Sequence, residues 1–294
     1  MDEEPRRPAG ETGALAPGLY LVATPIGNAR DITLRALDVL AAADILAAED
    51  TRNTRRLLTI HGVRRVAGGR LVAYHDHNGA AQRPRLLAAL GEGRSVALVS
   101  DAGTPLVADP GYRLVTEAVA AGHPVTAVPG ASAALAALSV AGLPSDRFLF
   151  AGFLPPRAAA RRRVLLELAS VPATLLWYES PRRLGDSLAD MAVVLGPDRP
   201  AAVCRELTKR FEEVRRGPLR TLAEAFAGVE PRGEIVVAVG PPPVAAPDAA
   251  VLDGALAAAL AGGGSVRDAA DAVAASLGLP RRQVYARALE IGRR

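Results

Sequence analysis

The chain has 294 residues, and half of them are hydrophobic, which allows about two domains with a sizeable core. Aromatic residues make up only 4%, so this core must consist of Ala, Val and Leu. A formal net charge of +4 permits a polyanionic partner such as nucleic acid but does not require one. Cys204 is the single cysteine, which excludes an internal disulfide and a cysteine zinc site and indicates a reducing interior.

Neither a targeting segment nor a membrane span is expected. Residues 1–17 lack the apolar stretch of a signal peptide, and we expect a disordered tail there and a cytoplasmic protein. The longest uncharged run, from Pro124 to Pro144, is interrupted by a Pro-Gly pair and predicts a strand, a turn and a helix. Cys204 lies in the apolar run AAVC and is expected to be a buried structural thiol.

Strand and helix patterns alternate along the first half of the chain. This alternation, with short loops, predicts a mostly parallel sheet that is covered on both faces. A domain boundary is expected at residues 142–146, where Gly and Pro interrupt the pattern. Strands are expected at 19–23, 44–48, 71–74, 95–100 and 125–128, with helices from about 33, from about 51 to 60, at 80–90, after 111 and from 133 to about 141.

A second alternation follows the boundary and ends at a Pro-rich linker, residues 241–248. The fold class is therefore α/β, with one α/β domain at 18–144 and a second at 145–240. About three short helices are expected beyond the linker, in a C-terminal extension at 249–294. In the second domain, strands are expected at 148–152, 174–178, 201–205, around 213–215 and at 234–239, and helices at 158–169, 181–195 and 221–227.

Clusters of polar, Gly and Pro residues follow nearly every expected strand. In parallel α/β sheets the carboxyl ends of the strands share one edge, so these loops should converge into a ligand site. The chain contains no P-loop and no GxGxxG after the first strand, and its single glycines favour a flat, mostly neutral group over a phosphate. The loops read TPIGN, EDTRNTRR, HDHN, SDAGTP and PGASA in the first half, and GFLPP, YESPRR, RELTKRFEE and PRGE in the second.

Two other chemistries find little support in these loops. His75 and His77 could ligate one metal ion, but no third ligand is evident, and we expect no metal site. A Ser-His-Asp hydrolase would need a nucleophile elbow, and Ser100, Ser132 and Ser180 all lie outside a GxSxG motif.

The chain closely resembles the bacterial ribosomal RNA methyltransferases that methylate a cytidine 2′-hydroxyl of the small subunit. That family belongs to the class III S-adenosylmethionine-dependent superfamily, together with the tetrapyrrole methylases. Nine sequence segments carry this resemblance and occur in the same order as in the family, whereas a single such segment would be weak evidence. They are LYLVATPIGNARDITLRAL from residue 19, EDTRNTRRLL from 49, YHDHN from 74, LVSDAGTPLVADPGYRLV from 98, VPGASAALAALSVAGLP from 128, FAGFLP from 150, YESPRR from 178, RELTKRFEE from 205 and GEIVVAVG from 233.

The resemblance implies two α/β domains that hold S-adenosylmethionine in the cleft between them, in an enzyme that forms a homodimer. It also implies small-subunit ribosomal RNA as the substrate, with the assembled 30S subunit as a candidate. One departure is Val239, which stands where an acidic residue is expected before the glycine, so the role of that position is in doubt. The implied cofactor contacts are Pro25, Asp101, Gly103, Thr104, Ser132 and Ala133, followed by Phe153, Leu207 and Gly233.

Methyl transfer to a ribose hydroxyl is helped by a base or by an electrostatic stabiliser of the forming alkoxide. Lys209, Asp101 and Glu179 are the catalytic candidates. Lys209 is the first choice because it is the single lysine among 35 basic residues, and Arg205 and Arg210 close in sequence could lower its pKa toward neutrality. The alternative is that Lys209 only pairs with a phosphate of the RNA.

RNA contacts are expected from the polar loops, at Arg52, Arg55, Arg56, Asn78, Arg182, Arg183 and Arg210. Two other functions stay open on the sequence. Methylation of a tetrapyrrole carbon shares the fold and also has a polyanionic substrate. A non-enzymatic RNA-binding module is the other, because residues 265–294 have the spacing of a helix-turn-helix, although packing or dimer contact is as good an explanation.

Overall fold

The structure is a computed structural model that describes residues 14–243, 249–263 and 265–292. The expected tail at 1–17 and the expected linker at 241–248 lie largely outside the described residues. Contacts divide the chain into two compact units, residues 1–241 and 242–294. The boundary expected near residue 144 lies inside the first unit and stays a prediction.

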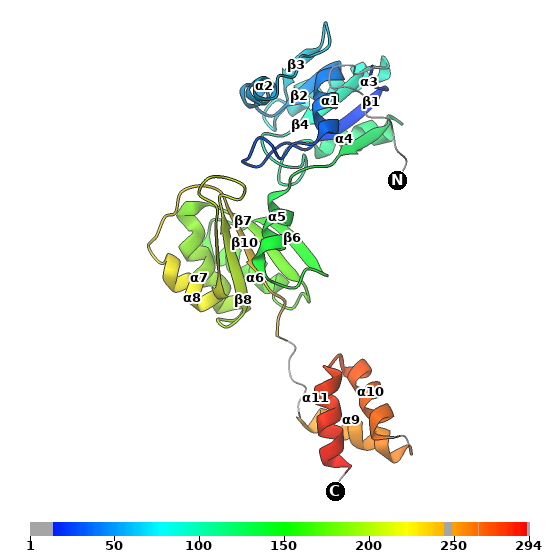
Figure 1. The fold of residues 1–294 in the computed structure, drawn as a ribbon, viewed down its shortest axis with the longest axis vertical. Coiled ribbons are helices and arrows are strands. Elements are labelled where there is room, and N and C mark those ends of the chain that lie inside the picture. Colours follow the sequence, from blue (N-terminus) through cyan, green and yellow to red (C-terminus); the bar gives the residue numbers. More distant parts are fainter. Residues whose placement is uncertain (1–13, 244–248, 264, 293–294) are drawn as a thin grey trace. The chain divides into compact units, whose positions relative to one another are not determined.

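The first half of the first unit contains a five-stranded sheet with strand order β3-β2-β4-β1-β5, in which every pairing is parallel (Figure 1). The parallel sheet predicted from the strand–helix alternation is confirmed here. Its strands are β1 (Gly18–Val22), β2 (Ile45–Ala48), β3 (Arg70–Ala73), β4 (Ser95–Val99) and β5 (Val125–Val128). The helices that follow them are α1 (Leu34–Ala42), α2 (Thr51–Ile60), α3 (Gly79–Gly91), α4 (Tyr112–Ala120) and α5 (Ala133–Ala141).

Alternate residues of the central strands serve the two faces of this sheet, as the two-residue period of a strand requires. On one face, Leu19 and Leu98 pack with Leu86 of α3 and Leu114 of α4. On the other face, Val22 and Val99 pack with Leu40 of α1 and Leu58 of α2. Both faces are therefore buried, and the polar residues collect in the loops at the carboxyl edge.

The second half contains another five-stranded sheet, of order β6-β7-β10-β8-β9, and it is mainly antiparallel. Only β6 and β7 pair in parallel, so a mostly parallel sheet is wrong for this half. The short loop 206–212 joins β8 and β9 as a hairpin and makes that pair antiparallel, and β10 lies between β7 and β8 antiparallel to both. Its elements are β6 (Phe148–Phe153), α6 (Ala158–Leu168), β7 (Thr174–Glu179), the 3-10 turn η1 (Pro181–Arg183), α7 (Leu184–Leu195), β8 (Pro200–Arg205), β9 (Glu213–Pro218), α8 (Leu219–Phe226) and β10 (Ile235–Val239).

The register of this sheet still brings the expected loops to one edge. The last residue of β7, Glu179, lies opposite Ile235, the first residue of β10. Ile235 in turn lies opposite Arg205 at the end of β8, which pairs with Glu213 at the start of β9. The YESPRR and RELTKRFEE loops therefore follow strands at this edge, whereas PRGE precedes one.

Helix α5 joins the two halves. It follows β5 in the chain, yet its small residues Ala134, Ala137 and Ala141 pack on the second sheet against Leu176 and Val236. The opposite face of that sheet carries the core around Trp177, covered by α6, α7 and α8. The two α/β halves thus share one apolar contact, and this contact fixes the loops of one half against those of the other.

The unit at 242–294 consists of α9 (Ala249–Ala261), α10 (Val266–Leu277) and α11 (Arg281–Ile291), as expected from the sequence. Leu256, Val273 and Val284 form its centre. Ser265 caps α10 by accepting a hydrogen bond from the Asp268 backbone nitrogen at 3.2 Å, and Gly278 ends the helix in the left-handed conformation. Across the described ranges 14–243, 249–263 and 265–292, no helix has the length and apolar character of a membrane span.

Asp190 of α7 holds a buried arginine. Its Oδ2 accepts a hydrogen bond from the Arg161 Nε at 2.6 Å, and its Oδ1 accepts one from Arg162 at 2.6 Å. Arg161 is buried, so Asp190→Asn would leave its charge unpaired and should lower the free energy of unfolding by about 3 kcal/mol. Urea unfolding followed by the fluorescence of Trp177 measures this change.

The matched control is Arg162→Met, which removes only the half-exposed partner of Asp190 and should cost less than about 1 kcal/mol. Equal stability of Asp190→Asn and the wild type would show that Arg161 needs no counter-ion.

Candidate functional site

A cavity of about 460 Å³ lies at the edge where the loops of both halves meet. The loops after β4 and β5 form one side of it, and the loops after β6, β7 and β8 together with the turn before β10 form the other. Pro25, predicted with this group, lines a neighbouring cavity instead. The residues predicted as cofactor contacts that do line it are Asp101, Gly103, Thr104, Ser132, Ala133, Phe153, Leu207 and Gly233.

Hydrogen bonds tie three loops of the first half into one wall. The backbones of Thr24 and Gly103 exchange two hydrogen bonds, at 2.9 and 3.0 Å. The Ser100 hydroxyl donates to the Gly103 carbonyl at 3.1 Å, and the Thr104 hydroxyl donates to the Ala131 carbonyl at 3.0 Å. Gly103 has a φ of +81°, a conformation that side chains disfavour, which explains a glycine at this turn.

The same wall continues into a strained segment between β4 and α4. Leu106 and Ala108 have φ values of 74° and 63°, which are uncommon for residues with a Cβ. The segment places Val107, Ala108 and Asp109 on the lining of the cavity. Because such conformations persist only where the surroundings enforce them, this loop is shaped for the cavity rather than for its own stability.

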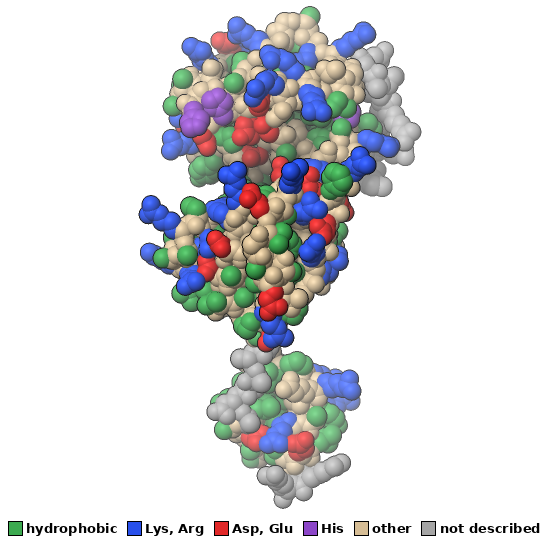
Figure 2. All heavy atoms as spheres, turned by 90° about the vertical axis from the view of Figure 1, so that its left-hand side faces the viewer, with side chains coloured by type: hydrophobic (Ala, Val, Ile, Leu, Met, Phe, Trp, Pro, Cys, Tyr) green, Lys and Arg blue, Asp and Glu red, His purple; other side chains and the backbone are tan. Residues whose placement is uncertain are grey.

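The cavity, which we call the acidic pocket, is lined by carboxylates and by no Lys, Arg or His of the described residues. The carboxylates are Glu49, Asp101, Asp109, Glu179 and Glu234. Figure 2 shows acidic side chains gathered on one face of the first α/β half, with Lys and Arg around them. Such a lining favours a ligand that carries positive charge.

Burial and mutual repulsion shift the titration of these carboxylates. Burial, followed by the charge of Glu49, raises the pKa of Asp109 to about 6. Burial and the charge of Asp101 also raise the pKa of Glu49. Sequence reasoning missed both residues as site residues, although each lies in a block quoted above, Glu49 before α2 and Asp109 in a turn. Both residues could have been recognised as site candidates from the sequence, because they lie in the loops that follow β2 and β4 at the carboxyl edge of the sheet.

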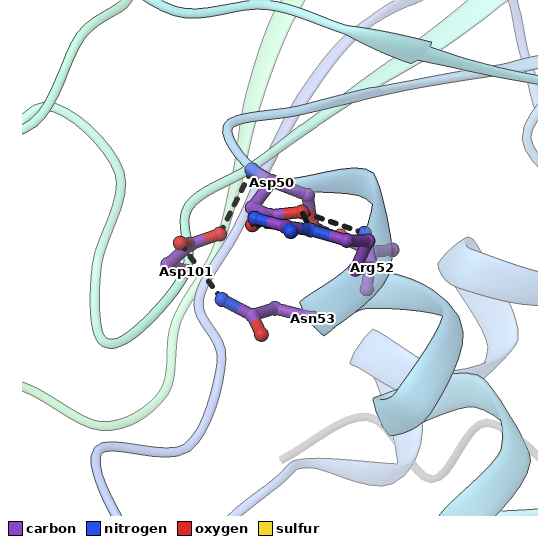
Figure 3. Close-up of polar contacts among 5 residues, drawn as sticks. Asp50, Arg52, Asn53 and Asp101 are labelled. Carbon is purple, nitrogen blue, oxygen red and sulfur yellow. Dashed lines mark hydrogen bonds and ion pairs between the residues drawn. The ribbon is translucent and has the colours of Figure 1, made fainter.

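Asp101 is held in place by the start of α2 (Figure 3). Its Oδ1 accepts a hydrogen bond from the Asp50 backbone nitrogen at 2.9 Å, and its Oδ2 accepts one from the Asn53 Nδ2 at 2.9 Å. Asp50 caps the helix and binds the Arg52 guanidinium, and this hydrogen bonding lowers the pKa of Asp50 to about 2. The Asp101 carboxylate therefore has a fixed orientation.

Lys209 is surrounded by carboxylates, not by the cations expected from the sequence. Its Nζ donates to Glu206 at 2.7 Å and to Glu234 at 2.9 Å. Partial burial acts to lower the pKa of Lys209, but these hydrogen bonds outweigh it and raise the pKa above its usual value. Arg205 is itself paired with Glu213. The lowered pKa that Arg205 and Arg210 suggested for Lys209 therefore finds no support in this geometry, and the role of Lys209 in catalysis stays a prediction.

The Lys209 loop also closes onto the first half. The Thr208 hydroxyl accepts a hydrogen bond from the Asn28 backbone nitrogen at 3.0 Å. A Cβ on Gly27 would lie 2.4 Å from the Lys209 Cγ and 2.7 Å from the Thr208 Oγ1, so no larger residue fits at that position without displacement. Glu206 and Thr208 adopt positive φ values of 51° and 65° to make this contact.

Glu179 uses both oxygens inside the protein. One accepts hydrogen bonds from the Ser180 backbone nitrogen at 2.7 Å and pairs with Arg183 at 2.9 Å, and the other accepts from the Ser187 hydroxyl at 2.6 Å. Arg183 also donates to the Leu154 carbonyl at 3.1 Å. These contacts give both residues a part in holding the turn after β7, while their predicted roles in catalysis and RNA binding stay predictions.

The other predicted RNA contacts differ in how free their side chains are. Arg52 and Arg182 are exposed but paired with Asp50 and Glu230. The Asn78 amide closes a turn, accepting from the His75 nitrogen at 2.9 Å and donating to the Ala73 carbonyl at 3.0 Å. Within the described ranges, Arg55 and Arg56 have exposed side chains and no ion pair, and Arg210 lies 5.5 Å from the ring of Phe211.

Comparison with known proteins shows the class of protein to which this chain belongs. Residues 18–223 match the family described as Tetrapyrrole (Corrin/Porphyrin) Methylases, and residues 245–292 match the RsmI C-terminal HTH domain. The crystal structure of uroporphyrin-III-C-methyltransferase from Thermus thermophilus is similar with a TM-score of 0.52 and 27% identity, over 76% of this chain and 93% of that one. The fold is thus that of the tetrapyrrole methylases.

Relatives that match along most of the chain identify the family within this class. Ribosomal RNA small subunit methyltransferase I of Mesorhizobium japonicum is 54% identical over 98% of this chain and 95% of its own. The protein of that name from Escherichia coli O157:H7 is 50% identical over 75% of this chain and 77% of its own. The chain therefore belongs to the tetrapyrrole methylases and, among them, to the family of ribosomal RNA small subunit methyltransferase I.

Gly27→Ala should lower the free energy of unfolding by about 1–3 kcal/mol, because the added methyl group overlaps Lys209 and Thr208. Gly91→Ala is the control, since the space around Gly91 at the end of α3 is open and alanine favours a helix. Chemical denaturation of both variants measures the difference. If they behave alike, the two loops separate in solution.

Asp109→Asn should stabilise the protein at pH 8 by about 1–2 kcal/mol, after a discount for partial exposure. The pKa of about 6 in the folded protein lies above the usual value of 3.8 for an aspartate. The folded state therefore binds more protons, and the stability that Asp109 contributes below pH 4 is lost as the pH rises through 6. The advantage of the variant should accordingly shrink between pH 8 and pH 4 in urea titrations.

The exposed residue Asp146 provides the control for this experiment, and Asp146→Asn should change the free energy of unfolding at pH 8 by less than about 0.5 kcal/mol. A stability gain for Asp109→Asn that is the same at every pH would refute the assignment.

Proposed function

We propose that the chain transfers a methyl group from S-adenosylmethionine to the ribose 2′-hydroxyl of a cytidine in small-subunit ribosomal RNA. The observation that carries the proposal is the acidic pocket, which lies where the blocks of the family resemblance converge. The 54% identity to a ribosomal RNA small subunit methyltransferase I over 98% of the chain supports the substrate class.

The acidic pocket fits S-adenosylmethionine by charge. When bound, this cofactor supplies a methyl group on a sulfonium cation, activated for attack by an oxygen nucleophile. Carboxylates such as Glu49 and Asp109 favour that cation, and no basic side chain among the described residues lining the pocket opposes it. The backbone at Gly103 and at Ser132–Ala133 offers close approach to an uncharged adenosine, while Phe153 and Leu207 supply apolar surface.

The residues of the chain then take separate tasks. Asp101, fixed by Asp50 and Asn53, orients the acceptor hydroxyl and accepts its hydrogen bond. Lys209, as a cation, positions Glu234, which lines the acidic pocket, and joins the second half to the loop at Gly27. Glu179 holds the turn after β7 that forms one wall of the pocket.

The partners follow from the substrate class. Arg55 and Arg56, as unpaired arginines, are the best placed among the described residues to bind phosphates. We further propose that the substrate is the assembled 30S subunit, that the enzyme is a homodimer, and that it acts in the cytoplasm, where that substrate is found. The unit at 242–294 is a second candidate for RNA contact or for dimer contact.

The test is methyl transfer by the full chain from labelled S-adenosylmethionine to 30S subunits, to free 16S RNA and to a precorrin. Nucleoside mass spectrometry should detect 2′-O-methylcytidine in the RNA. Label in the precorrin alone would favour tetrapyrrole methylation, and RNA binding without transfer would favour a binding module.

Lys209→Ala should lower the single-turnover rate by at least about tenfold, whereas Lys209→Arg, which keeps the charge, should retain more activity than Lys209→Ala. The pH profile of Lys209→Arg should match the wild type between pH 7 and 9, since the raised pKa of Lys209 leaves it protonated there. An inactive Lys209→Arg, together with a wild-type rate that rises as the pH approaches the pKa of Lys209, would restore Lys209 as the base. Near wild-type rates for Lys209→Ala would leave it without a catalytic role.

A further inference from the structure

A second cavity, of about 370 Å³, adjoins the acidic pocket and shares one side chain with it, that of Asp101. One side of the second cavity is a single face of α2, where Asn53, Arg56, Leu57 and Ile60 recur at helical spacing. The other side is the loop after β1, from Thr24 to Ala29.

The two cavities differ in the charged side chains that line them. Arg56 and Asp101 are the charged side chains on the lining of the second cavity, and within the described ranges Arg56 has no ion pair. The acidic pocket carries carboxylates alone among its charged lining residues. A cation is therefore favoured in the acidic pocket, whereas in the second cavity a phosphate is favoured next to Arg56 and a hydrogen-bond donor next to Asp101.

We propose that the second cavity is the site of the acceptor nucleotide, a single cytidine lifted out of its stack. This inference rests on the proposed function, because it assigns the acidic pocket to the methyl donor. The cavity lies at the small end of the range of about 300–1,000 Å³ for ligand sites, which suits one nucleotide and excludes a duplex. Single-stranded, unstacked bases are the usual targets of specific RNA recognition.

The lining supplies a partner for each part of a nucleotide. Leu57 and Ile60 offer apolar surface to the ribose and base, and Ile60 is 54% exposed although it faces this cavity. Arg56 supplies a cation for the phosphate. Asn53 donates its Nδ2 hydrogen to Asp101, and its oxygen points away from that contact (Figure 3), so it can accept from a base amine or a hydroxyl.

Asp101 connects the two sites. It lines both cavities, and the Asp50 nitrogen and Asn53 amide fix its carboxylate at their junction. A 2′-hydroxyl held in the second cavity could donate its hydrogen bond to Asp101 and turn its oxygen toward the acidic pocket. Asn53 is thus a positioning residue with two tasks: its amide nitrogen holds the Asp101 carboxylate, and its amide oxygen would hold the nucleotide.

The experiment uses the full chain with S-adenosylhomocysteine present to fill the acidic pocket. Binding of cytidine 5′-monophosphate is followed by saturation-transfer NMR, and binding of S-adenosylhomocysteine is measured separately by calorimetry. The blocking variant is Ala29→Phe, because Ala29 is a half-buried loop residue that lines the second cavity and not the acidic pocket. Arg56→Met and Asn53→Ala remove the two polar contacts.

We expect Ala29→Phe to abolish the nucleotide signal and Arg56→Met to weaken nucleotide binding about fivefold or more, with S-adenosylhomocysteine affinity unchanged within about twofold. In methyl transfer, Arg56→Met should raise KM for RNA more than it lowers kcat, and Asn53→Ala should lower kcat. The control is Arg94→Met, an exposed, paired arginine just before β4, which should leave every value unchanged.

Wild-type nucleotide binding that persists in Ala29→Phe, or a wild type that methylates RNA yet gives no nucleotide signal at 10 mM or below, would overturn the assignment of the second cavity. Loss of S-adenosylhomocysteine binding and of RNA methylation in the wild type itself would instead overturn the proposed function. Thermal melting of each variant separates loss of binding from loss of the fold.

Discussion

The loop after β1 must fit between two other parts of the first unit, and both cavities depend on that fit. Its backbone pairs with Gly103 through Thr24, and Gly27 leaves room for the aliphatic part of Lys209 from the other half. Ile26 lines the acidic pocket, and Pro25 and Ala29 line the second cavity. A small, tightly placed segment therefore separates two sites that would otherwise merge.

The charged side chains around this segment differ between the two cavities. Burial, and after it repulsion from Glu49 and Asp101, raises the pKa of Asp109, so the ionised carboxylates of the acidic pocket carry a cost in the free protein. A cationic ligand would relieve that repulsion and would gain affinity from it. Once such a ligand became neutral, the attraction would fall, so the same carboxylates that favour a charged donor also favour release of an uncharged product.

Much of this arrangement follows from local patterns in the sequence. The alternation of strands and helices predicts the first sheet, because parallel strands need crossover helices and those crossovers are long enough to recognise. Thr33 and Asp50 mark the starts of α1 and α2 by their capping hydrogen bonds. The convergence of the loops in that half follows directly, because every strand runs in the same direction.

What the sequence does not predict depends on contacts between distant residues. The second sheet is mainly antiparallel because β8 and β9 form a hairpin at 206–212 and because β10 inserts between β7 and β8, and helix and strand patterns do not give the direction of a strand. The charge state of Lys209 depends on Glu234, which is 25 residues away and comes close only through the pairing of β10 with β8. Arg205 and Arg210 are nearer in sequence, yet they have other partners.

Cys204 lines the acidic pocket and is also buried against the Ala137 carbonyl of α5. Burial raises the pKa of its thiol to about 11. The thiolate is the nucleophilic form of cysteine, and it is scarce at neutral pH under these conditions. With the methyl donor in the acidic pocket, as proposed, a soft nucleophile would stand beside an alkylating cofactor in its unreactive form, and the apolar packing that builds the core would keep it so.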